Sequence, residues 1–129
     1  DDREQLATLM AGICDSYTAD LLLTTGGTGL SLRDVTPEAT ADIAQRMVPG
    51  LAELMRLRSL SITERASLCR AVCATRAETL IVNLPGSPKA AIENLKAIME
   101  PLSHGLGILQ GTQGECAFEP NISEGEGEL

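Results

Sequence analysis

The stretch DLLLTTGGTGLSLRDVTPE, residues 20–38, decides the fold class expected of this chain. Its apolar start, residues 20–25, predicts a short buried strand that runs into a glycine turn. Its end, Thr36-Pro37-Glu38, predicts a helix start. Thr can cap a helix, Pro suits the first helical position, and Glu favours the positive end of the helix dipole. A strand, a glycine loop and a helix in succession are typical of an α/β domain.

The same order of elements returns near residue 80. Residues 79–84 (TLIVNL) predict a second buried strand, and Pro85-Gly86-Ser87-Pro88 predicts a tight turn with Ser87 as the cap of a helix over residues 89–99. Apolar spacing and turn signals predict the other elements: helices over residues 3–16, 36–47, 51–57, 64–69 and 101–109, and a strand over 70–75. We therefore expect a three-layer α/β/α sandwich with a mostly parallel sheet.

The composition predicts one domain followed by an acidic tail. A chain of 129 residues is long enough for a single core, and that core must be aliphatic because only 2% of the residues are aromatic. From residue 112 onward Gly, Glu and Ser dominate the sequence. We expect a domain over residues 1–111 and a solvated, disordered tail over residues 112–129.

Charge and hydropathy argue against several classes of partner. The net charge of −8 and the scarcity of aromatic residues disfavour nucleic acid, whose binding needs basic surface and stacking side chains. No apolar run approaches the roughly 20 residues that span a bilayer, and the first residues lack the pattern of a signal peptide. We expect a cytoplasmic protein that binds neither nucleic acid nor membrane.

A phosphate-bearing ligand is the expected occupant of the glycine loop. Gly26, Gly27 and Gly29 would let backbone N–H groups approach an anion at the carboxyl end of a strand, where open α/β sheets bind ligands. The helix from Thr36 would add unpaired N–H groups and its dipole. The alternative is a glycine turn that is needed only for its geometry. The side-chain donors expected in the same stretch are Thr25, Thr28, Ser31 and Arg33.

Asp34 is unexpected beside a phosphate site, because its carboxylate would repel the ligand. The repulsion is removed if Mg²⁺ lies between them, since this ion is held by one or two carboxylates together with substrate phosphates. The alternative is that Asp34 only caps the helix or pairs with Arg33.

The four cysteines match no common zinc spacing, and His104 is the single histidine. We expect Cys14, Cys69, Cys73 and Cys116 to be reduced thiols.

Several segments together resemble the molybdopterin adenylyltransferase family. These segments are TTGGTGLSLRDVTPEAT, VPGLAELMR, TLIVNLPGSPKA and PLSHGL, and they occur in the order typical of the family. The resemblance covers residues 1 to about 110 and implies the fold of the molybdenum-cofactor biosynthesis proteins. It implies transfer of AMP from Mg-ATP to the terminal phosphate of molybdopterin, with release of pyrophosphate. Such proteins usually form homotrimers and work beside a molybdenum insertase.

The resemblance also assigns roles to residues. Asp34 matches the essential Asp of the family's R-D-V-T-P motif, and Asp1 matches a second carboxylate implicated in handling Mg²⁺. Gly26-Gly27-Thr28-Gly29 matches the ligand loop, and Pro85-Gly86-Ser87-Pro88 matches a second loop lining the same pocket. Catalysis of this kind needs alignment and charge neutralisation rather than a general base, because the attacking phosphate is already anionic.

Three departures from the family pattern stand out. Cys69 occupies the position of a Ser that lies close to a bound phosphate, and a thiol is the weaker donor. Leu32 replaces a Pro in the turn before Arg33. An N-terminal strand with an S-D-[RK] motif is absent, so we expect the sequence to begin inside its domain.

Other functions remain open at this level. A molybdenum insertase shares the fold but carries additional domains, and the Moa-type paralogues share the loop motifs and the single-domain size. From another class, the chain would be a non-catalytic module that binds pterin ligands or assembles subunits.

Overall fold

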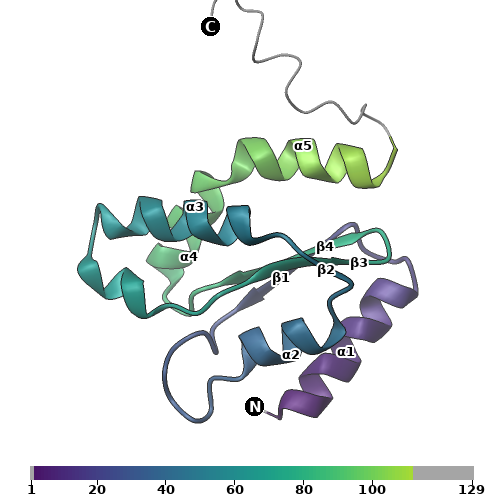
Figure 1. Cartoon of the computed structure of the whole chain (residues 1–129), viewed down its shortest axis with the longest axis horizontal. Coiled ribbons are helices and arrows are strands. Elements are labelled where there is room, and N and C mark those ends of the chain that lie inside the picture. The colour runs from purple at the N-terminus through teal and green to yellow at the C-terminus, as the bar shows by residue number, and fades with distance from the viewer. Residues whose placement is uncertain (1, 112–129) are drawn as a thin grey trace, which may run out of the picture.

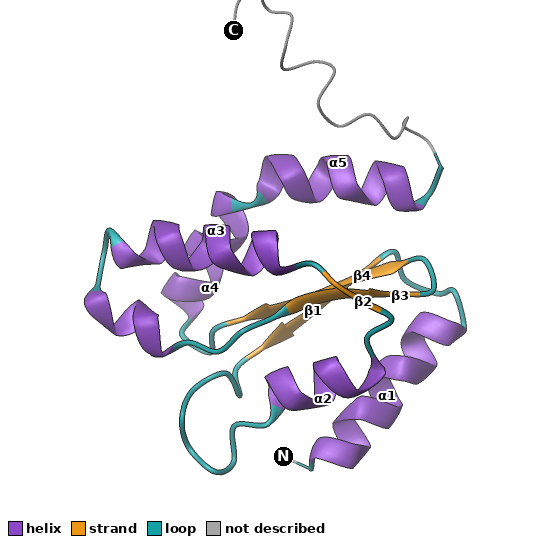
Figure 2. Ribbon diagram, viewed as in Figure 1, coloured by secondary structure: helices purple, strands orange, loops and turns teal. Residues whose placement is uncertain are grey.

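A four-stranded sheet lies between two layers of helices in the computed structural model, which describes residues 2–111 (Figure 1). The strands are β1 (Leu21–Thr25), β2 (Arg46–Met47), β3 (Cys73–Arg76) and β4 (Thr79–Leu84), in the order β1-β4-β3-β2. One face carries α1 (Arg3–Asp15) and α2 (Thr36–Ile43), as Figure 2 shows. The other face carries α3 (Pro49–Leu60), α4 (Pro88–Ala97) and α5 (Met99–Leu109), and a 3₁₀ helix, η1 (Glu64–Leu68), follows α3. The expected α/β sandwich is confirmed.

The sheet is mixed, which corrects the expectation of a mostly parallel one. β1 and β4 pair in parallel, whereas β3 is antiparallel to both β4 and β2. β3 and β4 are joined only by Ala77 and Glu78, with Ala77 in the left-handed region at φ 54°. A connection of two residues forms a hairpin, while a parallel pair needs a crossover of a dozen or more residues.

β4 is the centre of the core, and all six of its residues are buried. Leu80, Val82 and Leu84 face α3, α4 and α5, and Ile81 packs against α1 and α2. Because helices cover both faces, the strand is apolar throughout except for Thr79 and Asn83. The core is aliphatic, as the composition predicts.

Two expected elements differ from the structure. The helix from Thr36 ends at Ile43, because Gln45 N–H and Val48 N–H each donate over 2.9 Å to carbonyls of β3 and draw the chain into the sheet as β2. Thr36 is the first helical residue and not the cap, a position held by Val35 without a side-chain bond. The other expected helices and strands are present, with ends shifted by a few residues.

Asp1 and the tail over residues 112–129 lie outside the described residues, so the expected domain limits stay predictions. Within residues 2–111 no helix combines the length and the apolar character that crossing a membrane requires.

Candidate functional site

Two loops meet where β1 and β4 end. Because these strands are parallel neighbours, their carboxyl ends share one edge of the sheet, which is where α/β sheets bind ligands. Gly26 N–H donates to the Leu84 carbonyl over 2.9 Å, which joins the start of one loop to the end of the other strand. The fold thus brings the predicted residues 25–34 and 85–88 to one place.

The first loop folds back onto the start of α2. Gly26 and Gly27 have φ values of 87° and 71°, a conformation that favours glycine. Thr36 N–H donates to the Gly27 carbonyl over 3.1 Å, and Pro37 has no N–H to offer. The loop thus takes one of the N–H groups that the first turn of α2 was expected to offer to a ligand, that of Thr36.

The donors free for a ligand lie in the loop itself. Among residues 2–111, the backbone N–H groups of Gly27, Thr28 and Gly29 donate to no protein acceptor. Consecutive N–H groups in a turn with positive φ form concave sites that bind anions. Three free donors in succession are what an anion-binding loop requires, and the positive φ values of Gly26 and Gly27 also give the turn a geometric reason.

Asp34 keeps one carboxylate oxygen free. Its Oδ2 accepts from Ser31 N–H over 3.0 Å, while its Oδ1 has no partner within the described residues. Neither structural alternative is found, because Val35 is the cap of α2 and Arg33 forms no ion pair with Asp34 in that part of the chain. One free carboxylate oxygen beside a phosphate cradle suits Mg²⁺, which takes few protein ligands. Residues 2–111 hold no cluster of three or more metal-ligating side chains.

The four expected side-chain donors, Thr25, Thr28, Ser31 and Arg33, have different surroundings. The Thr28 side chain is buried, and its hydroxyl contacts the Cys69 thiol at 3.7 Å. Ser31 Oγ accepts from Arg33 N–H over 3.2 Å, which leaves its hydroxyl hydrogen available. Arg33 and Thr25 are exposed, and the Arg33 guanidinium has no partner among the described residues.

Arg70 is the site residue that sequence reasoning missed. Its guanidinium donates to the carbonyls of Gly29 and Asp34, over 2.7 and 2.8 Å, and pairs with the Glu38 carboxylate. Its backbone N–H donates to Thr28 O over 2.8 Å. No periodic pattern links Arg70 to a loop so much earlier in the chain, and the only signal was its position directly after Cys69.

The second loop supplies a well-capped helix. Ser87 Oγ accepts from Ala90 N–H over 3.4 Å and Pro88 is the first residue of α4, as expected. Pro85 is half-buried, whereas Gly86, Ser87 and Pro88 are exposed at the same edge as the glycine loop.

A hollow of about 220 Å³ adjoins the second loop at Pro85 and reaches Cys69, whose thiol contacts Thr28 of the first loop. It lies between α3, η1 and α4, and Cys69 and Pro85 belong to its wall together with Arg56, Arg65 and Asn94. Ligand pockets typically measure about 300–1,000 Å³, so this hollow is large enough for only part of a ligand.

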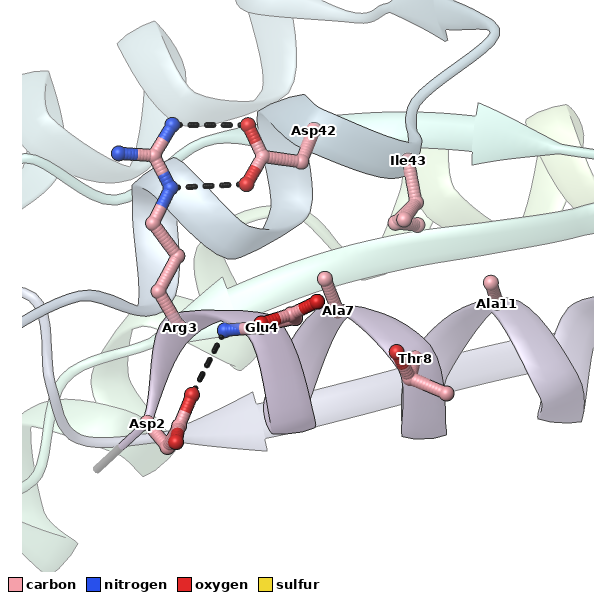
Figure 3. A pocket seen from close by; sticks show the side chains of 8 residues that line it. All are labelled: Asp2, Arg3, Glu4, Ala7, Thr8, Ala11, Asp42 and Ile43. Atoms are coloured by element: carbon pink, nitrogen blue, oxygen red, sulfur yellow. Dashed lines mark hydrogen bonds and ion pairs between the residues drawn. The ribbon is translucent and has the colours of Figure 1, made fainter.

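A wider hollow lies elsewhere, between α1 and α2, and Figure 3 shows its lining. There Asp2 caps α1 by accepting from Glu4 N–H over 2.9 Å, and Arg3 forms a two-pronged pair with Asp42 at 2.8 Å. These charged side chains already have hydrogen-bond partners, and none of them belongs to the glycine loop. The edge at β1 and β4 is therefore the candidate site.

The three described cysteines are free thiols, as expected. Burial raises the pKa of the Cys73 thiol to about 12 and also raises the pKa of Cys14, so both stay protonated at neutral pH. Cys116 lies outside the described residues.

Comparisons with known proteins agree with one another. A family model described as "Probable molybdopterin binding domain" matches residues 1–104. The molybdopterin adenylyltransferase of Helicobacter pylori (strain 26695) is 42% identical over 111 residues, which are 86% of this chain and 63% of the relative. That of Escherichia coli K12 is 41% identical over 100 residues, which are 78% of this chain and 51% of the relative.

A solved structure extends the likeness to the fold. The molybdopterin biosynthesis enzyme MoaB of Thermus thermophilus has a TM-score of 0.79 and 48% identity, over 85% of this chain and 69% of that one. The chain spans less than two thirds of the length of the two adenylyltransferases it matches.

Proposed function

The chain belongs to the molybdopterin-binding-domain family, and on that basis we propose that it transfers AMP from Mg-ATP to the terminal phosphate of molybdopterin. Pyrophosphate is the other product. The observation that carries the proposal is the row of free N–H groups at Gly27, Thr28 and Gly29 beside the free Oδ1 of Asp34. The names of the relatives support the same reaction.

The reaction places two phosphate groups side by side. An oxygen of the molybdopterin phosphate attacks the α-phosphorus of ATP, a new P–O bond forms, and the bond to the β-phosphate oxygen breaks with its electron pair leaving on pyrophosphate. No proton must be removed, because the attacking phosphate is an anion at neutral pH. The loop N–H groups bind phosphate oxygens, and Arg33 is free to neutralise charge on them.

Asp34 would hold Mg²⁺ through Oδ1, and Asp1 is proposed as the second carboxylate. When bound, the ion neutralises the phosphates and stabilises charge on the leaving pyrophosphate. The bond from Ser31 N–H to Oδ2 fixes the orientation of the Asp34 carboxylate. The hollow beside Cys69 and Pro85 would take one end of a substrate.

We further propose a cytoplasmic homotrimer that passes its product to a molybdenum insertase. These statements rest on the resemblance to the family.

The test is a turnover assay with ATP, Mg²⁺ and molybdopterin, which detects adenylyl-molybdopterin and pyrophosphate. The purified protein is expected to be active and to lose activity by about 100-fold or more when Asp34→Asn removes the charge. The matched control is Asp20→Asn, because Asp20 is exposed and lies before β1, at the far end of that strand.

Two results would contradict the proposal. A folded protein that binds molybdopterin, gives no turnover and is indifferent to Asp34→Asn would be a binding module. Equal turnover of wild type and Asp34→Asn would remove the carboxylate from the mechanism.

A further inference from the structure

We infer that Arg70 is a positioning residue, which holds the glycine loop and Asp34 in the geometry that adenylyl transfer requires. The inference rests on the proposed function and adds a residue to it. Arg70 precedes β3 and lies in sequence far from the loop that it contacts.

Arg70 contacts the loop at both of its ends. Its backbone N–H and its Nε donate to Thr28 O and Gly29 O, at the start of the loop, over 2.8 and 2.7 Å. Its Nη2 donates to the carbonyl of Asp34, at the end of the loop, over 2.8 Å. One side chain thereby sets the spacing between the phosphate cradle and the carboxylate proposed to hold Mg²⁺.

The segment between these anchors has little else to hold it. Leu30 is 66% exposed and Leu32 is 98% exposed, so neither side chain contributes packing. The remaining fixed points are bonds within the turn: Ser31 and Asp34 are joined over 3.0 and 2.9 Å, and Arg33 N–H donates to Ser31 Oγ over 3.2 Å. A turn held only by a few bonds of its own opens more often once its ends are released.

Glu38 holds Arg70 in its working orientation. One oxygen of this carboxylate pairs with Arg70 Nη1, and the other is buried with no hydrogen-bond partner. The pair with Arg70 also lowers the pKa of Glu38. Since Glu38 stands in the first turn of α2, the pair connects this helix to the segment before β3, which also holds the loop.

The planar fork of arginine is required for this arrangement. Three nitrogens of one rigid group reach three acceptors, whereas the ammonium of lysine is a compact point charge on a flexible stem. Arg70→Lys therefore keeps the charge and loses the simultaneous contacts. A displacement of about 1 Å at a reacting group can cost about 100-fold in rate.

The experiment compares Arg70→Lys and Arg70→Gln with Arg76→Gln as the matched control. Arg76 likewise binds one carboxylate, Asp15, and one carbonyl, that of Ile43, but at the opposite end of the sheet. Measurements are kcat and KM for ATP, the urea midpoint, and amide hydrogen exchange of residues 29–35.

The expected result is specific to positioning. Both Arg70 variants should lose about 10- to 100-fold in kcat with KM for ATP changed by less than about 3-fold. Exchange over residues 29–35 should accelerate by at least about 10-fold in these variants. Arg76→Gln should lower the urea midpoint and leave kcat and the exchange of that segment as in wild type.

Several results would overturn the inference. These are unchanged kcat and exchange in folded Arg70 variants, an equal loss of kcat in Arg76→Gln, or failure of both Arg70 variants to fold. If the wild type shows no turnover, the proposed function fails by itself. Exchange over residues 29–35 then still decides whether Arg70 positions the loop.

Discussion

Gly86 approaches Gly26 so closely that a Cβ on Gly86 would lie 3.3 Å from the Cα of Gly26. The ends of β4 and β1 therefore meet backbone against backbone. The two loops of the candidate site are in backbone contact, so a side chain added at Gly86 must shift one of them by a few tenths of an ångström.

Gly86→Ala tests this contact. Gly86 lies outside the positive-φ region, so the substitution brings a steric cost without backbone strain. Overpacking of this kind costs about 1–3 kcal/mol, and we expect the lower end because both loops are partly exposed. The displaced glycine loop should lower kcat/KM by about 10-fold or more. The control is Gly105→Ala in α5, where a Cβ would meet Leu80 at an ordinary 3.9 Å. Unchanged kcat/KM in Gly86→Ala would contradict the coupling of the loops.

Gly27→Ala is expected to be among the most damaging single substitutions. Residue 27 has φ 71°, and its new Cβ would overlap Thr36 Oγ1 and lie 3.2 Å from Thr36 Cβ. We expect a loss of about 2–4 kcal/mol in the free energy of unfolding, measured with urea. Adding Thr36→Ala should restore part of the loss, namely the steric part.

The control is Gly50→Ala, in α3 with open space around it, which should be neutral or stabilising by up to about 1 kcal/mol. A loss of less than about 1 kcal/mol in Gly27→Ala would show that the loop relaxes.

Asn83→Ala should destabilise the sheet beneath the site. Asn83 is fully buried, accepts from Val72 N–H over 3.1 Å, and donates to Thr24 Oγ1 and Thr40 Oγ1 over 3.0 and 3.1 Å. Removing the amide leaves several buried polar groups unpaired at once, and we expect a loss of about 3–5 kcal/mol. Thr40→Val should cost less, because it leaves the bonds to Val72 and Thr24 intact. If the two variants lose equal free energy of unfolding in urea, the bond to Thr40 accounts for the whole contribution of the Asn83 amide.

Acid should weaken the ion pair that ties α1 to β3. Asp15 accepts from Arg76 over 2.9 and 3.0 Å, and this bond lowers the pKa of the Asp15 carboxyl. Because the pKa of Asp15 is lower in the folded protein, the ion pair stabilises the fold at pH values above the pKa in the unfolded chain, about 3.9. This stabilisation is lost as the pH falls through the pKa in the folded protein. The urea midpoint of wild type should therefore exceed that of Asp15→Asn at about pH 6, and the gap should close towards about pH 3. A gap that stays constant with pH would mean that Asp15→Asn acts through packing.

The sequence determined the local parts of this protein. Strand β4 and its turn were predictable because a buried run of β-branched and aliphatic residues ends at Pro85-Gly86-Ser87-Pro88, and each of these residue types has a known local preference. The glycine loop was equally visible, since consecutive glycines are needed where φ is positive. Local preferences act within a few residues, and patterns record them.

The tertiary structure decided everything that depends on distant partners. It made residues 46–47 a strand, because β3 offered carbonyls to Gln45 and Val48, and it turned β3 antiparallel through a two-residue hairpin. It also brought the Arg70 guanidinium to the carbonyls of Gly29 and Asp34. It left the N–H groups of Gly27, Thr28 and Gly29 free, whereas the Thr36 N–H is bonded to the loop. Hydrogen bonds between segments tens of residues apart leave no periodic trace in a sequence, so only the folded chain shows which donors remain for a ligand.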